Sequence, residues 1–360
     1  MVIHTFSTSL PLFFKKINHF FVLIMGIETT IQTLYFHEET SIYSICTTGR
    51  HLYTAGGDAK IRAWHIHKEE RAGNEDFSVK NPVNSLVKIT YCSTLEGHKK
   101  TVNCVRNISI NGEQYLISCD DSGKILFWVL NGCEYECHKI FSTDSCQEII
   151  YAEKDGNNYI ICGLNTGKLI LLDLILNHKV PKAKLLQTIK AHTMPIEGLA
   201  YNMKYNIIST MSKDASCKLY QIQKKKLALY ETIEKITEKY SFADEHEIIL
   251  TRRHSFSQCG KFMYLTTCKN VSKPVSTTLR YPFHDDCIYG KNEGLDGFVS
   301  KVIDVEEFGP IFFTGYNCYI PEKDIIIKDC VLQPVIDACY RGNIIFIASV
   351  DGFIATIRFD

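Results

Sequence analysis

The residues GHKKTVNCVRNISINGEQYLISCDDSGKILFW, from Gly97 to Trp128, form the most informative stretch of this sequence. A Gly-His pair is followed by an apolar run, a polar turn, a second apolar run, an acidic turn and a third run that ends in tryptophan. Short runs of β-branched and aromatic residues separated by turn residues are typical of β-strands. The stretch therefore predicts several consecutive short strands.

The same pattern recurs along the chain. Clear copies run from His37 to Trp64 and from His192 to Tyr220, and weaker copies lie at 149–173, 252–267 and 335–360. Self-similarity at a roughly fixed period indicates a repeat architecture. One small sheet cannot bury both of its faces alone, so repeated sheets are expected to pack radially.

The pattern resembles the WD-repeat β-propeller, which implies an all-β fold of seven blades. In that family a loop histidine and a turn aspartate form a hydrogen-bond network within the blade. The matching residues here are His37, Asp58, Trp64, His98, Asp121, Trp128, His192, Asp214, Tyr220 and Asp351. Asp58 and Asp214 precede their aromatic residue by the expected spacing. In the repeat that ends at Trp128, Asp121 lies one residue early, and we explain this by an insertion in the turn.

The domain prediction is a single propeller over residues 25–360, with residues 1–24 as an extension outside the fold. The apolar run from Phe20 to Met25 is far shorter than the ~20 residues that cross a bilayer. The chain ends on a strand, and the early strand at 31–36 lacks preceding partners. We therefore expect strand 31–36 to pair in the last blade and close the ring, which removes two exposed sheet edges.

Composition limits the functional class. The 40 basic and 40 acidic residues give a formal net charge of zero, which argues against a domain that grips nucleic acid through bulk charge. The 15 cysteines are an odd number without a CxxC pair, which is typical of free thiols in a reducing compartment. Cys133, Cys137 and His138 lack a second ligand pair, so neither a metal nor a cofactor is expected.

A more specific resemblance rests on four segments. They are TVNCVRNISINGEQYLIS at 101–118, LYQIQKKKLALY at 219–230, RRHSFSQCGKFMYLTT at 252–267 and SVDGFIATIRFD at 349–360. Together they resemble the WD-repeat subunit of chromatin assembly factor, the replication-coupled histone chaperone complex. The resemblance is faint between about 268 and 330.

The resemblance implies a non-catalytic scaffold subunit in the nucleus. Its partners would be the large subunit of the complex, a second histone-binding WD-repeat subunit and histones H3-H4, with DNA reached only indirectly and no membrane contact. One alternative is the WD-repeat subunit of the replication-independent histone deposition complex. Another is a WD-repeat adaptor of a ubiquitin ligase or a trafficking coat. A propeller-fold hydrolase or lyase would require carboxylates and histidines that converge at the central channel with perturbed pKa values.

Two basic runs are the candidate partner-binding residues: Lys224, Lys225 and Lys226, and the pair Arg252 and Arg253. A run of cations on an outer strand predicts docking of an acidic partner segment with salt-sensitive affinity. Arginine suits bidentate carboxylate contacts. The competing interpretation is a solvated outer strand whose lysines discourage strand addition.

Overall fold

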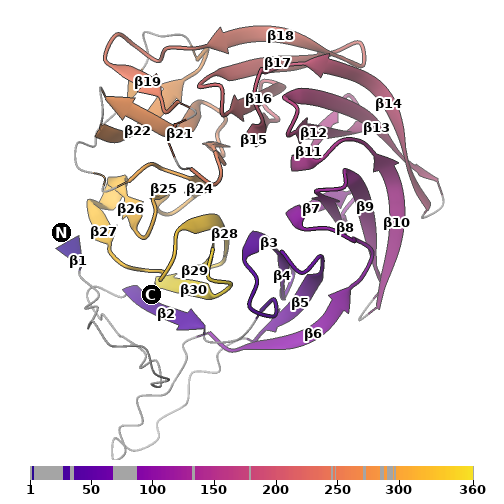
Figure 1. Ribbon diagram of the computed structural model, residues 1–360, viewed down its shortest axis with the longest axis horizontal. Coiled ribbons are helices and arrows are strands. Elements are labelled where there is room, and N and C mark those ends of the chain that lie inside the picture. Colours follow the sequence, from indigo (N-terminus) through magenta and orange to yellow (C-terminus); the bar gives the residue numbers. More distant parts are fainter. Residues whose placement is uncertain are drawn as a thin grey trace, which may run out of the picture.

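In a computed structural model, seven sheets surround a central axis, and all their strand pairs are antiparallel except one edge pair in the sixth sheet (Figure 1). The structure describes residues 2–3, 27–32, 36–67, 87–131, 134–177, 180–244, 246–247, 249–270, 273–283, 288–289, 295 and 297–359. In the first four blades the strand earliest in the sequence lies nearest the axis and the fourth lies at the rim (Figure 1). The prediction of an all-β propeller with seven blades is therefore confirmed.

The first four blades are regular four-stranded sheets. The first contains β3 (Ile42–Thr48), β4 (His51–Gly56), β5 (Ile61–Ile66) and β6 (Ile89–Leu95), and the second contains β7 (Val102–Ile110), β8 (Glu113–Asp120), β9 (Lys124–Asn131) and β10 (Glu134–Ser142). The third contains β11 (Cys146–Lys154), β12 (Asn157–Leu164), β13 (Lys168–Asn177) and β14 (Val180–Lys190), and the fourth contains β15 (Ile196–Asn202), β16 (Ile207–Ser212), β17 (Cys217–Gln223) and β18 (Lys226–Ile233).

The last three blades depart from this plan. The fifth contains β19 (Tyr240–Phe242), β20 (Ser255–Phe256), β21 (Phe262–Asn270), β22 (Lys273–Arg280) and β23 (Ile288–Tyr289). The sixth contains β24 (Lys301–Val305), β25 (Gly309–Phe313), β26 (Cys318–Ile320), β27 (Ile325–Ile327) and β1 (Val2–Ile3), with a short 3-10 helix at Pro321–Lys323. The seventh contains β28 (Val335–Arg341), β29 (Ile344–Ser349), β30 (Ile354–Phe359) and β2 (Ile27–Gln32).

The ring is closed by β2, which pairs antiparallel with β30 from Ile27 opposite Phe359 to Gln32 opposite Ile354. This strand ends at Gln32, four residues before the end expected from the sequence. Phe36 lies outside it, because its ring is buried against Trp64 of the first blade at a centroid distance of 4.5 Å. N-terminal and C-terminal segments thus share one sheet.

The extension at 1–24 is not wholly outside the fold, which corrects that expectation. β1 pairs in parallel with β27, with Val2 opposite Ile326. An apolar Val-Ile pair extends the outer edge of the sixth blade, where β27 would otherwise expose its backbone groups. Residues 4–26 lie outside the described part of the chain.

The core is divided among the interfaces between neighbouring blades. Each buried apolar cluster combines side chains from two adjacent blades, and the clusters together follow the whole ring. Because each blade presents two apolar faces, burial against both neighbours is the main stabilising contribution. Within the described residues, no helix is long and apolar enough to cross a membrane.

Candidate functional site

The first blade contains the hydrogen-bond network that its sequence predicts. His37 lies with Nδ1 2.7 Å from Asp58 Oδ1 and Nε2 2.8 Å from Thr54 Oγ1. The Trp64 indole donates to the same Thr54 hydroxyl at 2.9 Å. Burial alone raises the pKa of Asp58, but hydrogen bonds from His37 and Arg62 outweigh it and lower the pKa to about 2. The network ties the loop before the blade to its turn and its third strand.

The second blade forms the same network with a different aspartate. His98 lies with Nδ1 2.8 Å from Asp120 Oδ2 and Nε2 2.7 Å from Ser118 Oγ. Trp128 donates to Ser118 Oγ at 2.8 Å. The assignment of Asp121 to this network is therefore wrong, and Asp120 takes that role.

The physical reason is the turn between β8 and β9. Asp120 Oδ1 accepts the backbone amides of Ser122 and Lys124, each at 2.9 Å, so its carboxylate reaches the turn from the end of β8. Asp121 is exposed and accepts from the Asn103 side chain at 2.7 Å. The network aspartate of this blade thus lies nearer the start of the turn than Asp58 does in the first blade, and the network forms without an insertion.

In the fourth blade the network keeps its histidine and its acid. His192 Nε2 lies 2.7 Å from Thr210 Oγ1, and Nδ1 lies 3.1 Å from the Asp214 carboxylate. Tyr220 replaces the tryptophan and is buried in the cluster between the third and fourth blades. This position therefore contributes apolar packing.

Asp351 occupies the corresponding turn of the seventh blade. Its Oδ1 accepts from Ser349 Oγ at 2.5 Å and from the backbone amide of Phe353 at 2.9 Å. These bonds close the turn locally. Asp351 thus stabilises its own hairpin.

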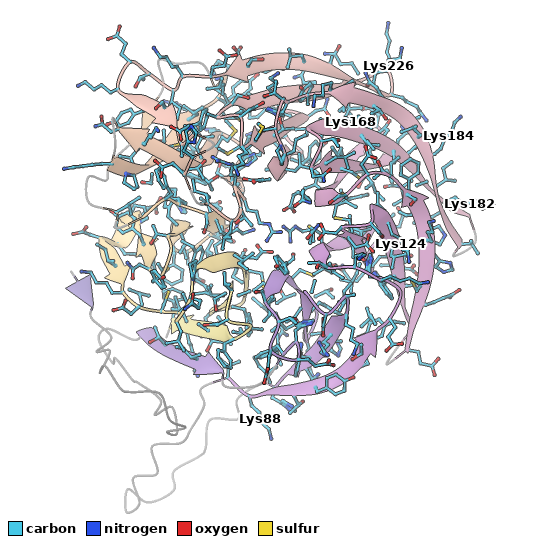
Figure 2. All side chains as sticks on the ribbon, viewed as in Figure 1. Lys88, Lys124, Lys168, Lys182, Lys184 and Lys226 are labelled. Carbon is cyan, nitrogen blue, oxygen red and sulfur yellow. The ribbon has the colours of Figure 1, made fainter. Side chains whose placement is uncertain are left out.

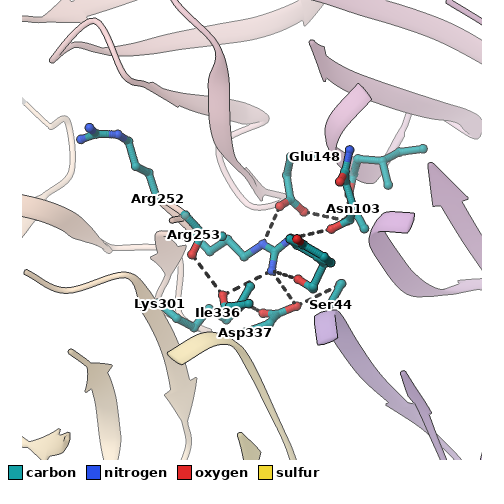
Figure 3. A network of polar contacts seen from close by, with 12 residues as sticks. Ser44, Asn103, Glu148, Arg252, Arg253, Lys301, Ile336 and Asp337 are labelled. Atoms are coloured by element: carbon teal, nitrogen blue, oxygen red, sulfur yellow. Dashed lines mark hydrogen bonds and ion pairs between the residues drawn. The ribbon is translucent and has the colours of Figure 1, made fainter. Parts of the chain in front are cut away.

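Arg253 lies at the centre of the ring and is 4% exposed. Its Nε donates to Glu148 Oε2 at 2.7 Å, and Nη1 lies 3.2 Å from Asp337 Oδ2 (Figure 3). The guanidinium also donates to the backbone carbonyls of Tyr43 at 2.7 Å and Asn103 at 2.9 Å. One side chain therefore connects the first, second, third and seventh blades.

Two further cations complete this central network. Arg106 lies 2.6 Å from Glu148 and 3.0 Å from Asp337, and Lys301 lies 3.0 Å from Asp337. Burial raises the pKa of both carboxyl groups, but the cations outweigh it and hold both pKa values below their usual range. The carboxylates are therefore ionised and their charge is compensated inside the ring.

Arg252 is also buried, with 1% exposure. Its side chain points away from that of Arg253 (Figure 3) and donates to Glu197 Oε2 at 3.0 Å and to Thr267 Oγ1 at 2.8 Å. The prediction that Arg252 and Arg253 bind a partner is therefore wrong. The chain between β19 and β20 turns inward, where Arg253 pairs with the buried Glu148 and Arg252 pairs with the half-buried Glu197, both from other blades.

The centre also contains His254, whose Nε2 lies 2.5 Å from Ser209 Oγ. Burial dominates its electrostatics and lowers the pKa to about 4. Both side chains are buried, at 4% and 0% exposure, so this pair does not face solvent. Carboxylates and a histidine do converge here, as a catalytic propeller would require. The carboxylates, however, are already paired with cations, and the histidine is already hydrogen-bonded within the protein.

Lys224, Lys225 and Lys226 lie at the hairpin between β17 and β18 and are exposed. Lys225 Nζ lies 3.1 Å from Asp173 Oδ2 of the third blade. The lysine run is thus at the rim, on the opposite side of the sheets from the buried arginines. Its role in partner binding stays a prediction.

Sequence reasoning missed Arg106, Glu148, Lys301 and Asp337, which build the central network. Each is a charged residue on the innermost strand of its blade, next to apolar residues, and this interruption was the available signal. Cys137 and His138 lie on β10, while Cys133 lies outside the described residues. Across the described residues, no group of three or more His, Cys, Asp or Glu side chains has an arrangement that could hold a metal ion.

Comparison with known proteins agrees with the architecture. The WD40 family (WD domain, G-beta repeat) matches residues 28–65 and 89–129. The first match runs from β2 to the end of β5, and the second covers β6 to β9. The chain is a β-propeller with WD40 repeats.

Two curated relatives are chromatin assembly proteins. The chain is 27% identical over 99 residues to a chromatin assembly factor 1 protein of Saccharomyces cerevisiae, which is 26% of this chain and 19% of that protein. It is 25% identical over 195 residues to the chromatin assembly factor 1 subunit FAS2 homolog of Oryza sativa subsp. japonica, which is 51% of this chain and 34% of that protein. The aligned segments thus span a fifth to a third of these relatives. The chain is similar, at low identity, to chromatin assembly factor subunits.

Proposed function

We propose that this chain is a non-catalytic scaffold subunit of a nuclear histone chaperone complex that deposits H3-H4 on replicating DNA. The observation that carries the proposal is the similarity to two chromatin assembly factor subunits from a fungus and a plant. The proposed partners are the large subunit of the complex, a second histone-binding WD-repeat subunit and histones H3-H4. DNA is reached through these partners.

The geometry supports a scaffold role. The central carboxylates are bound by Arg106, Arg253 and Lys301, which fixes the innermost strands relative to one another. A ring of blades held in this way presents its loops and outer strands as rigid partner surfaces. Neutral overall charge fits indirect contact with DNA.

Affinity purification of the tagged chain from its own cells, with mass spectrometry of the bound proteins, tests this function. We expect a large charged subunit, a second propeller and histones H3 and H4, together with a nuclear signal in cell fractionation. Recovery of histones with a different large scaffold would assign the chain to the replication-independent complex. Recovery of ligase or coat subunits without histones would contradict the proposal.

A further inference from the structure

A basic wedge lies at the rim between the third and fourth blades. We define it as Lys182, Lys184, Lys224, Lys225 and Lys226. In the β13–β14 ladder, Lys182 is opposite Ile175 and Lys184 is opposite Asp173, so all four side chains share one face of the sheet. Lys225 of the fourth blade reaches Asp173 at 3.1 Å, which shows that this face is turned toward the fourth blade.

Further geometry agrees with this placement. The backbone amide of Leu227 on β18 donates to Gln187 Oε1 on β14 at 2.6 Å, just above the lysine hairpin. Figure 2 shows Lys182, Lys184 and Lys226 along the outer edge of the ring. The five lysines therefore come from two blades and meet at one surface.

The wedge has a large excess of positive charge. All five lysines are exposed, and Asp173 is paired with Lys225 alone. Among the described residues, no carboxylate lies within ion-pair distance of Lys182, Lys184, Lys224 or Lys226. The next acid at this end of the third blade, Asp155, is exposed and lies 3.9 Å from Lys154. The wedge is thus a locally cationic surface on a chain of zero net charge.

Apolar side chains accompany the lysines. Ile175 is 39% exposed beside Lys182, and Leu229 of β18 is 58% exposed on the face that carries buried Leu227. The wedge is bordered by β14, an 11-residue rim strand that pairs on one side with β13. In the part of the chain that the structure describes, no strand pairs with the other edge of β14, which leaves its backbone amides and carbonyls open to an added strand.

The lysine hairpin also holds an unfavourable backbone conformation. Lys224 and Lys225 have φ values of 48° and 60° in a two-residue turn. Two-residue turns with the same left-handed backbone join the first and second strands of the second and third blades, and they use Asn111-Gly112 and Asp155-Gly156, the residue types that this turn geometry favours. Two lysines in the left-handed region are strained, and such strain is concentrated at functional positions.

We propose that the basic wedge binds an acidic, extended segment of a protein partner, laid along the free edge of β14. Carboxylates at alternate positions of an added strand repeat at about 7 Å, which matches the spacing of Lys182 and Lys184 along β14. Apolar residues at further positions on the same face of the segment would cover Ile175 and Leu229. This inference deepens the proposed scaffold function, because it names the chemistry of a partner segment. It rests on the proposed function only for the identity of the protein that carries the segment.

The surface favours an acidic protein over a nucleic acid. Non-specific DNA binding depends on several phosphate contacts along an extended basic face. Here the lysines occupy a short wedge and alternate with exposed aliphatic side chains. That mixture matches an amphipathic strand with carboxylates and apolar residues.

Fluorescence anisotropy with the purified full chain tests the proposal. The probe is a fluorescein-labelled peptide of about 12 residues whose odd positions carry glutamate and isoleucine and whose even positions carry threonine, long enough to run along β14. We expect saturable binding that weakens as NaCl rises from about 50 mM to about 500 mM. Lys182→Glu/Lys184→Glu should weaken binding at least about tenfold, whereas Lys182→Arg/Lys184→Arg should retain it.

The matched control is Lys99→Glu/Lys100→Glu, which makes the same change in net charge at two exposed lysines outside the wedge. It should leave binding unchanged. Absence of saturable binding, or equal loss in this control, would overturn the proposal. Tighter binding of a duplex DNA of about 20 base pairs than of the peptide would assign the wedge to nucleic acid instead.

Aggregation of Lys182→Glu/Lys184→Glu without loss of peptide affinity in the monomeric fraction would show that the lysines only protect the edge of β14. Lys182→Ser/Lys184→Ser, which keeps the edge polar, separates this outcome from misfolding. The two proposals fail independently. Absence of saturable peptide binding by a wild-type chain that still recovers the proposed histone complex would mean that the wedge fails alone. Salt-sensitive peptide binding by a wild-type chain that recovers no histones would mean that the proposed function fails alone.

Discussion

Two clusters of positive charge, one at the centre of the ring and one at its rim, differ in their carboxylate partners. At the centre, Arg106, Arg253 and Lys301 surround two buried carboxylates, and each cation has a partner within 3.0 Å. At the rim, among the described residues, Lys225 pairs with Asp173 and the other four lysines of the basic wedge have no carboxylate within ion-pair distance. Buried cations are retained by the carboxylates they neutralise, whereas exposed cations without partners remain available to another molecule.

Replacement of Arg253 with methionine should produce the largest effect, a loss of about 3–5 kcal/mol in the free energy of unfolding. Glu148 would lose one of its two cations and Asp337 one of three, while both remain buried. Urea denaturation followed by tryptophan fluorescence measures the loss. Lys226→Met is the exposed control and should change stability by less than about 0.5 kcal/mol. Similar small losses in both variants would mean that the centre does not depend on its charges.

A pH titration sharpens the comparison because the buried centre responds to protons. The folded protein holds His254 with a pKa of about 4, below its ordinary value of 6.5, so the unfolded chain binds the proton more tightly. Stability should therefore fall as pH drops from about 6.5 to about 4, by about 3 kcal/mol. The groups that influence His254 include Glu148, which favours its protonation, and Lys301, which opposes it.

His254→Gln should remove that step in thermal unfolding measured across the same pH range. The difference between wild type and variant isolates the histidine, because carboxylates with depressed pKa values affect stability at lower pH. A wild-type profile that stays flat down to pH 4, or a variant with the same decline, would contradict the assignment.

The second blade offers a smaller test through Asp120 and Asp121. Asp120→Asn should cost about 1–3 kcal/mol, because the buried hydrogen bond to His98 and the turn amides is disturbed. Asp121→Asn changes an exposed residue and should cost less than about 1 kcal/mol. Because hydrogen bonds lower the pKa of Asp120 to about 2 despite its burial, its contribution should vanish as pH falls from about 4 to about 2. A larger loss for Asp121→Asn in chemical denaturation would restore the sequence-based assignment.

The sequence predicted the propeller because the network residues are local. His37, Asp58 and Trp64 lie within one blade, so their spacing is visible in the chain. The correct acid of the second blade was ambiguous, because Asp120 and Asp121 are adjacent and turn geometry decides between them.

Contacts between blades could not be predicted in this way, because their residues are far apart in the sequence. The Arg252-Arg253 pair resembles a surface motif, and its burial depends on Glu148, Glu197 and Asp337 from three other blades. Lys182 and Lys184 escaped notice for the same reason. They join the lysine hairpin only through the register of β13 and β14 and the contact between Lys225 and Asp173.

The variant with the smallest expected change in stability, Lys224→Asn, tests whether the strained backbone of the lysine hairpin serves partner binding. Lys224→Asn places a residue that tolerates positive φ at the first turn position and leaves the Lys225–Asp173 pair intact. The variant should be more stable than wild type by about 0.5 kcal/mol, because the left-handed backbone is less strained with asparagine. It should also bind the acidic peptide more weakly, because one of the five wedge cations is lost.

Thermal unfolding and peptide anisotropy on the same preparation measure both changes. Lys99→Asn is the control, since it removes an exposed lysine outside the wedge and should alter neither quantity. Opposite signs for stability and binding would indicate that the strained lysine is present for its charge. A variant that is more stable and binds equally well would show that Lys224 contributes nothing to docking, and would restrict the wedge to the lysines of β14 and their immediate neighbours.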